Sequence, residues 1–261
     1  MNNYPYTNKI FDSHAHYDDD SFDIDRSGVL SLLPQNGVEL VINAASNLDS
    51  AQKGIAYAKE FAHIYAAVGI HPHDAAKAPV DYLHTLRTMA AESKVCAIGE
   101  IGLDYHYDFS PREVQRAVFE AQLLLANELD LPVIIHDREA HGDMYELLKK
   151  MRPKSGVLHC FSGGVELLKE TLSLGLYIGL GGAVTFKNAK KPIEVAAAVP
   201  LERLLLETDA PYMSPVPFRG KRCESPMIAL VAQKISEIKG VSVEEVIGVT
   251  NQNARQLFKI S

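Results

Sequence analysis

The sequence predicts an α/β fold, a TIM (β/α)8 barrel. Eight apolar runs alternate with helix-like segments at about 30 residues per unit, which is the spacing of βαβ units. The runs are almost continuously apolar, which indicates parallel strands buried on both faces. A chain of 261 residues is long enough for one barrel, and no repeat or change in composition marks a second domain within 1–261. A doubly wound open sheet is the alternative, but the glycine-rich dinucleotide loop after its first strand is missing.

The first half of the chain contains four predicted strand–helix units. Pro34 ends the first helix, because proline lacks the backbone N–H that continues the hydrogen-bond ladder. The second helix carries an apolar stripe that includes Ile55 and Ala58. Ser110 can cap the fourth helix, and Glu113 completes a capping box. In order, we expect a strand ending in the 11–16 stretch, a helix at 23–33, a strand at 38–44, a helix at 48–61, a strand at 64–70, a helix at 80–91, a strand at 95–101 and a helix from 110 to about 129.

The second half repeats this alternation and closes with helices. Short apolar runs bounded by glycine or proline predict the strands. Ser242 and Glu245 form a second capping box, which predicts a helix start. In order, we expect a strand at 132–137, a helix through 144–148, a strand at 156–161, a helix near 165–174, a strand at 176–182, a helix near 192–198, a strand at 204–208, and two or three closing helices over 226–239, 243–249 and 252–258.

Composition excludes several classes of protein. The three cysteines, Cys96, Cys160 and Cys223, are odd in number and far apart, which argues against a disulfide framework or a zinc ribbon and fits a reducing compartment. We see no signal peptide, and no apolar run approaches the roughly 20 residues that span a bilayer, so we expect a cytoplasmic protein without membrane association. The formal net charge of -7 disfavours broad electrostatic binding of nucleic acid, so a polyanionic substrate must be held by a few residues or ions.

Side chains that can bind metal stand at or near the ends of five of the eight predicted strands. In a barrel, catalytic residues collect at the carboxyl ends of the strands. Burying these polar groups without partners would cost several kcal/mol, and a metal ion is a partner for all of them. Cys160 follows His159 directly, so strand alternation predicts that its thiol faces the other way, into the core. The candidate metal ligands are His14, His16, Glu100, His136, His159 and Asp209.

This candidate set is too large for one tetrahedral ion, which takes three protein ligands and water. Two ions that share a carboxylate, about 3.5–4 Å apart in such sites, would use all six residues. Zinc, manganese, cobalt and magnesium all suit the mixed nitrogen and carboxylate ligation. Asp209 can also accept the proton of the attacking water, which leads to hydrolysis, most naturally of a phosphate ester. We assign one ion to His14, His16, Glu100 and Asp209, and the other to Glu100, His136 and His159.

Loops that follow the strands carry candidate substrate-binding residues. His71 follows the third strand and either touches substrate or orders its own loop. Arg138 can clamp a phosphate with two parallel hydrogen bonds, or it pairs with a neighbouring acidic residue. Basic and aromatic residues follow the seventh and eighth strands, where barrels often hold phosphate, although a solvated run of charges is the alternative. The loop after the eighth strand contributes Arg219, Lys221 and Arg222.

Six motifs in order, DSHAH, GIHPH, IGEIGLDYH, PVIIHDREAHGD, GVLHCFSG and ETDAPYMSP, resemble those of the TatD family of metal-dependent hydrolases. The resemblance runs from Phe11 to Phe258. It implies a TIM barrel of the metal-dependent hydrolase type, a divalent metal site, and the DNase activity of several members. The family's ligand positions fall on the six candidate ligands. One departure is Cys223, where relatives commonly carry asparagine.

These features together predict a hydrolase with a dinuclear metal site that activates water. We expect a phosphodiesterase, a deoxyribonuclease of the 3′–5′ exonuclease type acting on strand ends of DNA, with no obligate protein partner. An amidohydrolase-like enzyme that cleaves a small amide or lactone is the alternative, because the same water could attack carbon. A metal-stabilised binding protein without turnover is a third hypothesis, against which the full ligand set argues.

Overall fold

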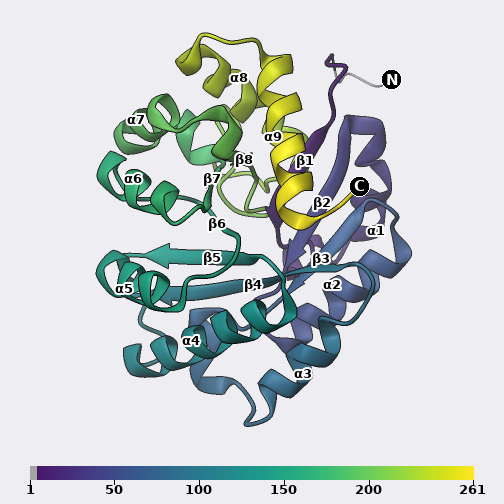
Figure 1. The fold of residues 1–261 in the computed structure, drawn as a ribbon. Helices are drawn as coiled ribbons and strands as arrows, with labels where there is room; N and C mark the ends of the chain where they lie inside the picture. The colour runs from purple at the N-terminus through teal and green to yellow at the C-terminus, as the bar shows by residue number, and fades with distance from the viewer. Residues whose placement is uncertain (1–4) are drawn as a thin grey trace.

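The computed structural model describes residues 5–261 and contains a sheet of eight strands in the order β1 to β8, each paired in parallel with the next. A parallel bridge between Ala15 and Ala210 joins the end of β1 to the segment that follows β8, so the sheet closes on itself. The backbone N–H of His16 donates to the Ala210 carbonyl across this seam, at 2.7 Å. Helices surround the strands (Figure 1), and the predicted TIM barrel is confirmed.

The helices and strands alternate along the chain as the sequence predicts. The strands are β1 (Ile10–Ala15), β2 (Val38–Ala44), β3 (Ile64–Val68), β4 (Val95–Asp104), β5 (Val133–Arg138), β6 (Gly156–Leu158), β7 (Tyr177–Leu180) and β8 (Leu204–Leu206). The helices are α1 (Arg26–Leu32), α2 (Leu48–Glu60), α3 (Tyr82–Met89), α4 (Arg112–Leu129), α5 (His141–Met151), α6 (Val165–Ser173), α7 (Lys190–Ala198), α8 (Ile228–Lys239) and α9 (Val243–Phe258).

The barrel has two apolar cores. The larger one lies between the strands and the surrounding helices and includes Ile10 and Leu204. The smaller one combines strand residues, such as Phe11, with Leu257 and Phe258 from α9. The rings of Phe11 and Phe258 lie with their centroids 6.1 Å apart. The end of α9 therefore closes the barrel at the amino ends of the strands and leaves the carboxyl ends for the site.

Of the two or three closing helices that the sequence allows, the structure has two, α8 and α9, and α9 spans both 243–249 and 252–258. Its Ser242 cap is confirmed by a hydrogen bond from the Glu245 N–H (3.1 Å). One prediction about the helices is wrong. Ser110 does not cap α4, which begins after Pro111. Its hydroxyl instead donates to the His73 carbonyl at 3.1 Å, so it fixes the loop after β3.

Within residues 5–261, no helix combines the length and the apolar composition that a membrane span requires.

Candidate metal centre

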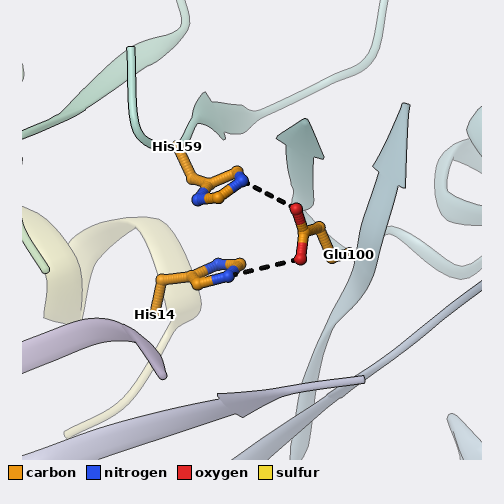
Figure 2. Close-up of side chains that lie close together, drawn as sticks. All are labelled: His14, Glu100 and His159. Atoms are coloured by element: carbon orange, nitrogen blue, oxygen red, sulfur yellow. Dashed lines mark ion pairs between the residues drawn. The ribbon is translucent and has the colours of Figure 1, made fainter. Parts of the chain in front are cut away.

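Glu100, on β4, lies at the centre of a cluster of side chains at the carboxyl ends of the strands. Figure 2 shows its carboxylate facing the rings of His14 and His159. The Oε1 atom lies 2.7 Å from His159 Nε2, and the Oε2 atom lies 3.4 Å from His14 Nε2. All three residues are buried, and the two imidazole rings are stacked with centroids 3.9 Å apart. Both rings therefore present a nitrogen to the same carboxylate.

His16 and Asp209 extend this cluster on the side of β1. The Nε2 atoms of His16 and His14 lie 3.4 and 3.7 Å from Asp209 Oδ1. His16 Nδ1 donates to the Ala44 carbonyl at 2.9 Å. Because a carbonyl can only accept, this bond places the proton on Nδ1 and turns Nε2 toward the cluster.

His136 and His71 approach Glu100 from the side of β3 and β5. His136 Nδ1 lies 2.8 Å from Glu100 Oε1, and His71 Nε2 lies 3.5 Å from the same atom. The structure thus brings together all six candidate ligands, and it adds His71, which the sequence suggested as a substrate contact.

The residues of the cluster fit a bound metal. His14 Nε2 and His16 Nε2 lie 3.0 Å apart, and His136 Nδ1 and His159 Nε2 lie 3.2 Å apart. Two imidazole nitrogens that face each other cannot both donate, whereas a cation accepts a lone pair from each. Imidazole and carboxylate donors without thiolate suit several divalent ions. Three sets place one ligand atom per residue within 4.8 Å of the others: His14, Glu100 and His159; His14, His16 and Asp209; His71, Glu100 and His136.

The charges of the cluster also fit a cation. Burial lowers the pKa of His14 to about 4 and that of His71 to about 4, so both rings are neutral at pH 7, the form that binds metal. Burial alone would raise the pKa of Glu100, but the rings around it hold that pKa well below its usual range. Burial also opposes protonation of His16, yet its hydrogen bond with Asp209 and the charge of Glu100 raise its pKa to about 10. The carboxylates therefore require positive charge, which a metal ion supplies when bound.

Two further buried carboxylates orient members of the cluster. Asp104 Oδ2 accepts hydrogen bonds from His136 Nε2 (3.1 Å) and His73 Nε2 (2.9 Å). The first bond leaves His136 Nδ1 facing Glu100, as expected for a partner that fixes a metal-binding histidine. Asp12, beside His14, accepts from the hydroxyl of Thr208 at 2.6 Å and so ties β1 to the residue before Asp209.

The backbone brings these side chains close together. A side chain at Gly102 would collide with the backbone of His136, so only glycine lets β4 and β5 approach at this level. Asp209 has a φ of 60°, a left-handed conformation that is uncommon outside glycine. Its N–H donates to the His14 carbonyl at 3.0 Å, which holds this conformation in place. Uncommon backbone conformations of this kind cluster at functional sites.

Glu207 lies behind His159 and is almost fully buried. Its Oε1 atom accepts a hydrogen bond from the Cys160 N–H and lies 3.8 Å from His159 Nδ1. Gly179 leaves room for the carboxylate, because a Cβ there would collide with Oε2. Burial raises the pKa of Glu207 to about 8. A carboxylate behind a metal-binding histidine usually accepts its second N–H, so we expect Glu207 to hold His159 with Nε2 toward Glu100.

The pKa of Glu207 predicts how the stability of the metal-free protein depends on pH. The pKa is raised from the ordinary value of 4.5 to about 8, so between these values the folded state holds a proton that the unfolded state has released. The contribution of Glu207 to the free energy of unfolding must therefore fall as pH rises from about 5 to 8, by about 1 kcal/mol per pH unit. Replacing Glu207 by glutamine removes this contribution. The slope of the free energy of unfolding against pH, measured by urea unfolding of protein treated with a chelator, should become less negative by that amount.

The control for this prediction is Glu166→Gln, because the Glu166 side chain is 86% exposed. This variant should keep the wild-type slope. The other buried groups with shifted pKa values, among them Asp12 at about 6 and His14 and His71 at about 4, are present in both the wild type and Glu207→Gln, so the difference between the two slopes isolates Glu207. Equal slopes in the wild type and Glu207→Gln would contradict the assignment.

The predicted substrate-binding residues fall into two groups. Arg138 and His71 line a cavity of about 350 Å³ that opens at the cluster. Arg219 lies with its guanidinium 3.8 Å from the centre of the Phe186 ring. Lys221 lies over another loop aromatic, Phe218, at 5.6 Å. Arg222 donates to Asp25 and to Glu224, so its charge is already paired with two carboxylates. Contact of these five residues with substrate stays a prediction.

The prediction that the Cys160 thiol faces the core is wrong. Strand β6 ends at Leu158, so the alternation of a strand does not extend to Cys160. Its φ of 43° turns the chain, and the residue lines the cavity. Burial and the charges of Asp209 and Glu207 raise the pKa of its thiol well above the usual range, so the thiol stays protonated. Cys223 is buried in the loop after β8, where its N–H donates to the Pro211 carbonyl at 2.9 Å.

Sequence reasoning left Glu207 and the position of His71 unrecognised, although both had a signal. His71 and His73 follow a strand with the same two-residue spacing as His14 and His16. Glu207 stands two residues before Asp209 in an otherwise apolar run, where a carboxylate is rarely buried without a function.

The chain matches the family model described as "TatD related DNase" over residues 11–259. It is 41% identical over 254 residues to the protein named uncharacterized metal-dependent hydrolase YabD from Bacillus subtilis, covering 97% of this chain and 100% of that protein. It is 35% identical over 257 residues to the protein named 3′-5′ ssDNA/RNA exonuclease TatD from Erwinia amylovora, covering 95% and 99%. Among solved structures, YjjV, a TatD homologue from Escherichia coli, superposes with a TM-score of 0.91 at 33% identity, covering 97% and 98%.

Proposed function

The chain belongs to the TatD family of metal-dependent hydrolases, and we propose that it is a 3′–5′ exonuclease that acts on single-stranded ends of nucleic acid. The observation that carries this proposal is the convergence of five imidazoles on the carboxylate of Glu100. The printed activity of the relative from Erwinia amylovora, on ssDNA and RNA, supports the choice of substrate.

The centre has residues for two metal ions that share Glu100. A pair of bound ions supplies positive charge for the entering and leaving oxygens of a displacement. Glu100 and the histidines around it hold that charge in place. The cluster has ligand atoms on both sides of Glu100, with His14 and His16 on one and His136 and His71 on the other. We therefore propose two ions in place of one.

Asp209 is the proposed general base. Burial alone would raise its pKa, but the hydrogen bond with His16 and the charges of the neighbouring rings lower it, so the carboxylate is ionised at neutral pH. Its side chain is 18% exposed, and the residue lines the cavity, so it can reach a water molecule beside the substrate. An ionised carboxylate in this position can accept the proton of that water.

The cavity supports a strand end as the substrate. A volume of about 350 Å³ lies at the lower end of the range for small-molecule pockets, so the cavity admits one nucleotide unit and excludes a duplex. Arg138 is the proposed phosphate clamp, because a guanidinium can give a phosphate two parallel hydrogen bonds. A protein with a net charge of -7 has to rely on such local contacts for a polyanion.

The test combines metal analysis with activity on defined substrates. Purified protein, loaded with zinc, manganese, cobalt or magnesium in turn, is incubated with 5′-end-labelled single-stranded DNA, RNA and duplex DNA. We expect metal-dependent release of 5′-mononucleotides from the 3′ end of single strands. The same preparations are tested on cyclic amides and lactones. Turnover of these compounds without cleavage of phosphodiesters would identify the protein as an amidohydrolase. Binding without turnover of any substrate would identify it as a binding protein.

A further inference from the structure

Two exposed aromatic rings lie beside the cavity, in the loop between β4 and α4. Tyr107 and Phe109 are stacked, with ring centroids 5.2 Å apart and planes 19° from parallel. They are 47% and 66% exposed, whereas most large apolar side chains of the described chain are buried in the two cores. A pair of stacked rings that faces solvent next to a polar cavity is typical of a ligand-binding surface.

The loop holds these rings in position without a ligand. Asp104 Oδ1 accepts hydrogen bonds from the N–H groups of His106 (3.0 Å) and Tyr107 (2.9 Å). Asp108, between the two rings, has a left-handed φ of 50° and forms an ion pair with Arg112 at 2.7 Å. The platform, which we define as Tyr107 and Phe109, is therefore ordered before a partner arrives, which lowers the entropic cost of binding.

A chain of contacts connects the platform to the metal centre. The His73 ring meets Phe109 edge to face with centroids 4.8 Å apart. His73 Nε2 lies 2.9 Å from Asp104 Oδ2, and the same oxygen lies 3.1 Å from His136 Nε2. Only His73 and Asp104 thus separate Phe109 from a proposed metal ligand, and the His73 and His136 rings have centroids 6.3 Å apart.

A positive charge lies beside the platform and at the cavity. The guanidinium carbon of Arg138 is 4.7 Å from the centre of the Tyr107 ring, and Arg138 also lines the cavity. A partner of this surface therefore meets apolar rings and a cation beside the cavity that holds the proposed metal ions. A nucleotide offers matching groups, a base for the rings and a phosphate for the cation.

We propose that the platform stacks a base of the single-stranded substrate next to the phosphodiester that is cleaved. This proposal rests on the proposed function and adds to it the residues that position the strand. Stacking on an aromatic ring tolerates every base, so the platform holds a strand without reading its sequence. It also selects single strands, because a paired base within a duplex has no free face to offer.

The test compares Phe109→Ala and Tyr107→Ala with the wild type on two substrates. The KM for a short single-stranded oligonucleotide should rise at least about fivefold in Phe109→Ala. The kcat/KM for bis(p-nitrophenyl) phosphate, which does not reach the platform, should stay at the wild-type value. Phe109→Trp should restore the KM, because it restores an aromatic face. Leu124→Ala is the matched control, since Leu124 is 50% exposed on α4. This variant should keep the wild-type kinetic constants for both substrates.

A second measurement tests stacking without turnover. Fluorescence anisotropy with a labelled oligothymidylate, in the presence of a chelator, should show at least about fivefold weaker binding to Phe109→Ala. An oligonucleotide with abasic sites at its 3′ end should bind the wild type and Phe109→Ala equally. Equal loss with the intact and abasic oligonucleotides, or no loss with either, would overturn the platform. If the wild type cleaves no phosphodiester, the proposed function fails, and the binding comparison still decides whether the platform binds bases.

Discussion

Replacing Glu100 by alanine should lower kcat/KM for phosphodiester hydrolysis by at least about 10³-fold and should lower the metal content of the protein together with it. Glu100 contacts His14 and His159 through different oxygens, so its loss removes the proposed shared ligand of both ions. The candidate ligands that remain are imidazoles and the single carboxylate of Asp209, which offer less negative charge to a divalent cation. Metal content is measured by elemental analysis after gel filtration, and activity with bis(p-nitrophenyl) phosphate.

Two further variants make this result specific. Glu166→Ala removes an exposed carboxylate on α6 and should keep both metal and activity. Glu100→Gln keeps the size of the buried side chain, so it should fold as the wild type does, judged by circular dichroism, and still lose metal. Full activity in Glu100→Gln would show that this carboxylate is not needed for the reaction. Loss of activity with both ions retained would show that Glu100 is not the shared ligand.

Replacing Asp209 by asparagine should lower kcat at pH 7 by about 10²- to 10⁴-fold, the range for loss of a general base. Asparagine keeps an oxygen beside His14 and His16 but cannot accept the proton of water. The metal content should therefore fall much less than in Glu100→Ala. The difference in kcat between the wild type and the variant should shrink as pH rises, because hydroxide can attack without a general base. The measurement is the pH profile of kcat for both proteins.

The matched control is Asp130→Asn, since the Asp130 side chain is 63% exposed and lies outside the cavity. It should reproduce the wild-type profile. A loss in Asp209→Asn that is constant from pH 6 to 9 and parallels the loss of metal would make Asp209 a ligand without a role as a base.

Strand β2 was predictable because the local sequence decides it. Strand β2 has the predicted bounds, Val38–Ala44, since an apolar run that follows a glycine has few alternatives in a parallel sheet. Helix α9 was not predictable as one helix, because Asn251 and Asn253 are weak helix formers. Their side chains donate to the Lys9 and Leu204 carbonyls, at 2.8 and 2.9 Å, and these distant contacts keep the helix continuous.

The convergence of the six candidate ligands was predictable for a different reason. Parallel strands of a barrel end at one rim, so polar residues at strand ends must meet, and the six chosen residues do lie together. The ends of β6 and β8 were predicted too long, because Cys160 and Asp209 turn away from strand geometry to reach the cluster. The basic loop residues were the least predictable. Whether Arg222 faces substrate or Asp25 depends on where α1 packs, which no local pattern reveals.

The seam between β1 and the segment after β8 has a consequence for how the protein is made. His14 and Asp209 lie on opposite sides of this seam, and their side chains approach to 3.7 Å. A ribosome produces the first of them almost two hundred residues before the second. The early half of the chain can form its own strand–helix units during translation. The set of candidate metal ligands stays incomplete until β8 and the residues after it emerge. Tight uptake of metal must therefore wait until synthesis of the barrel is nearly finished.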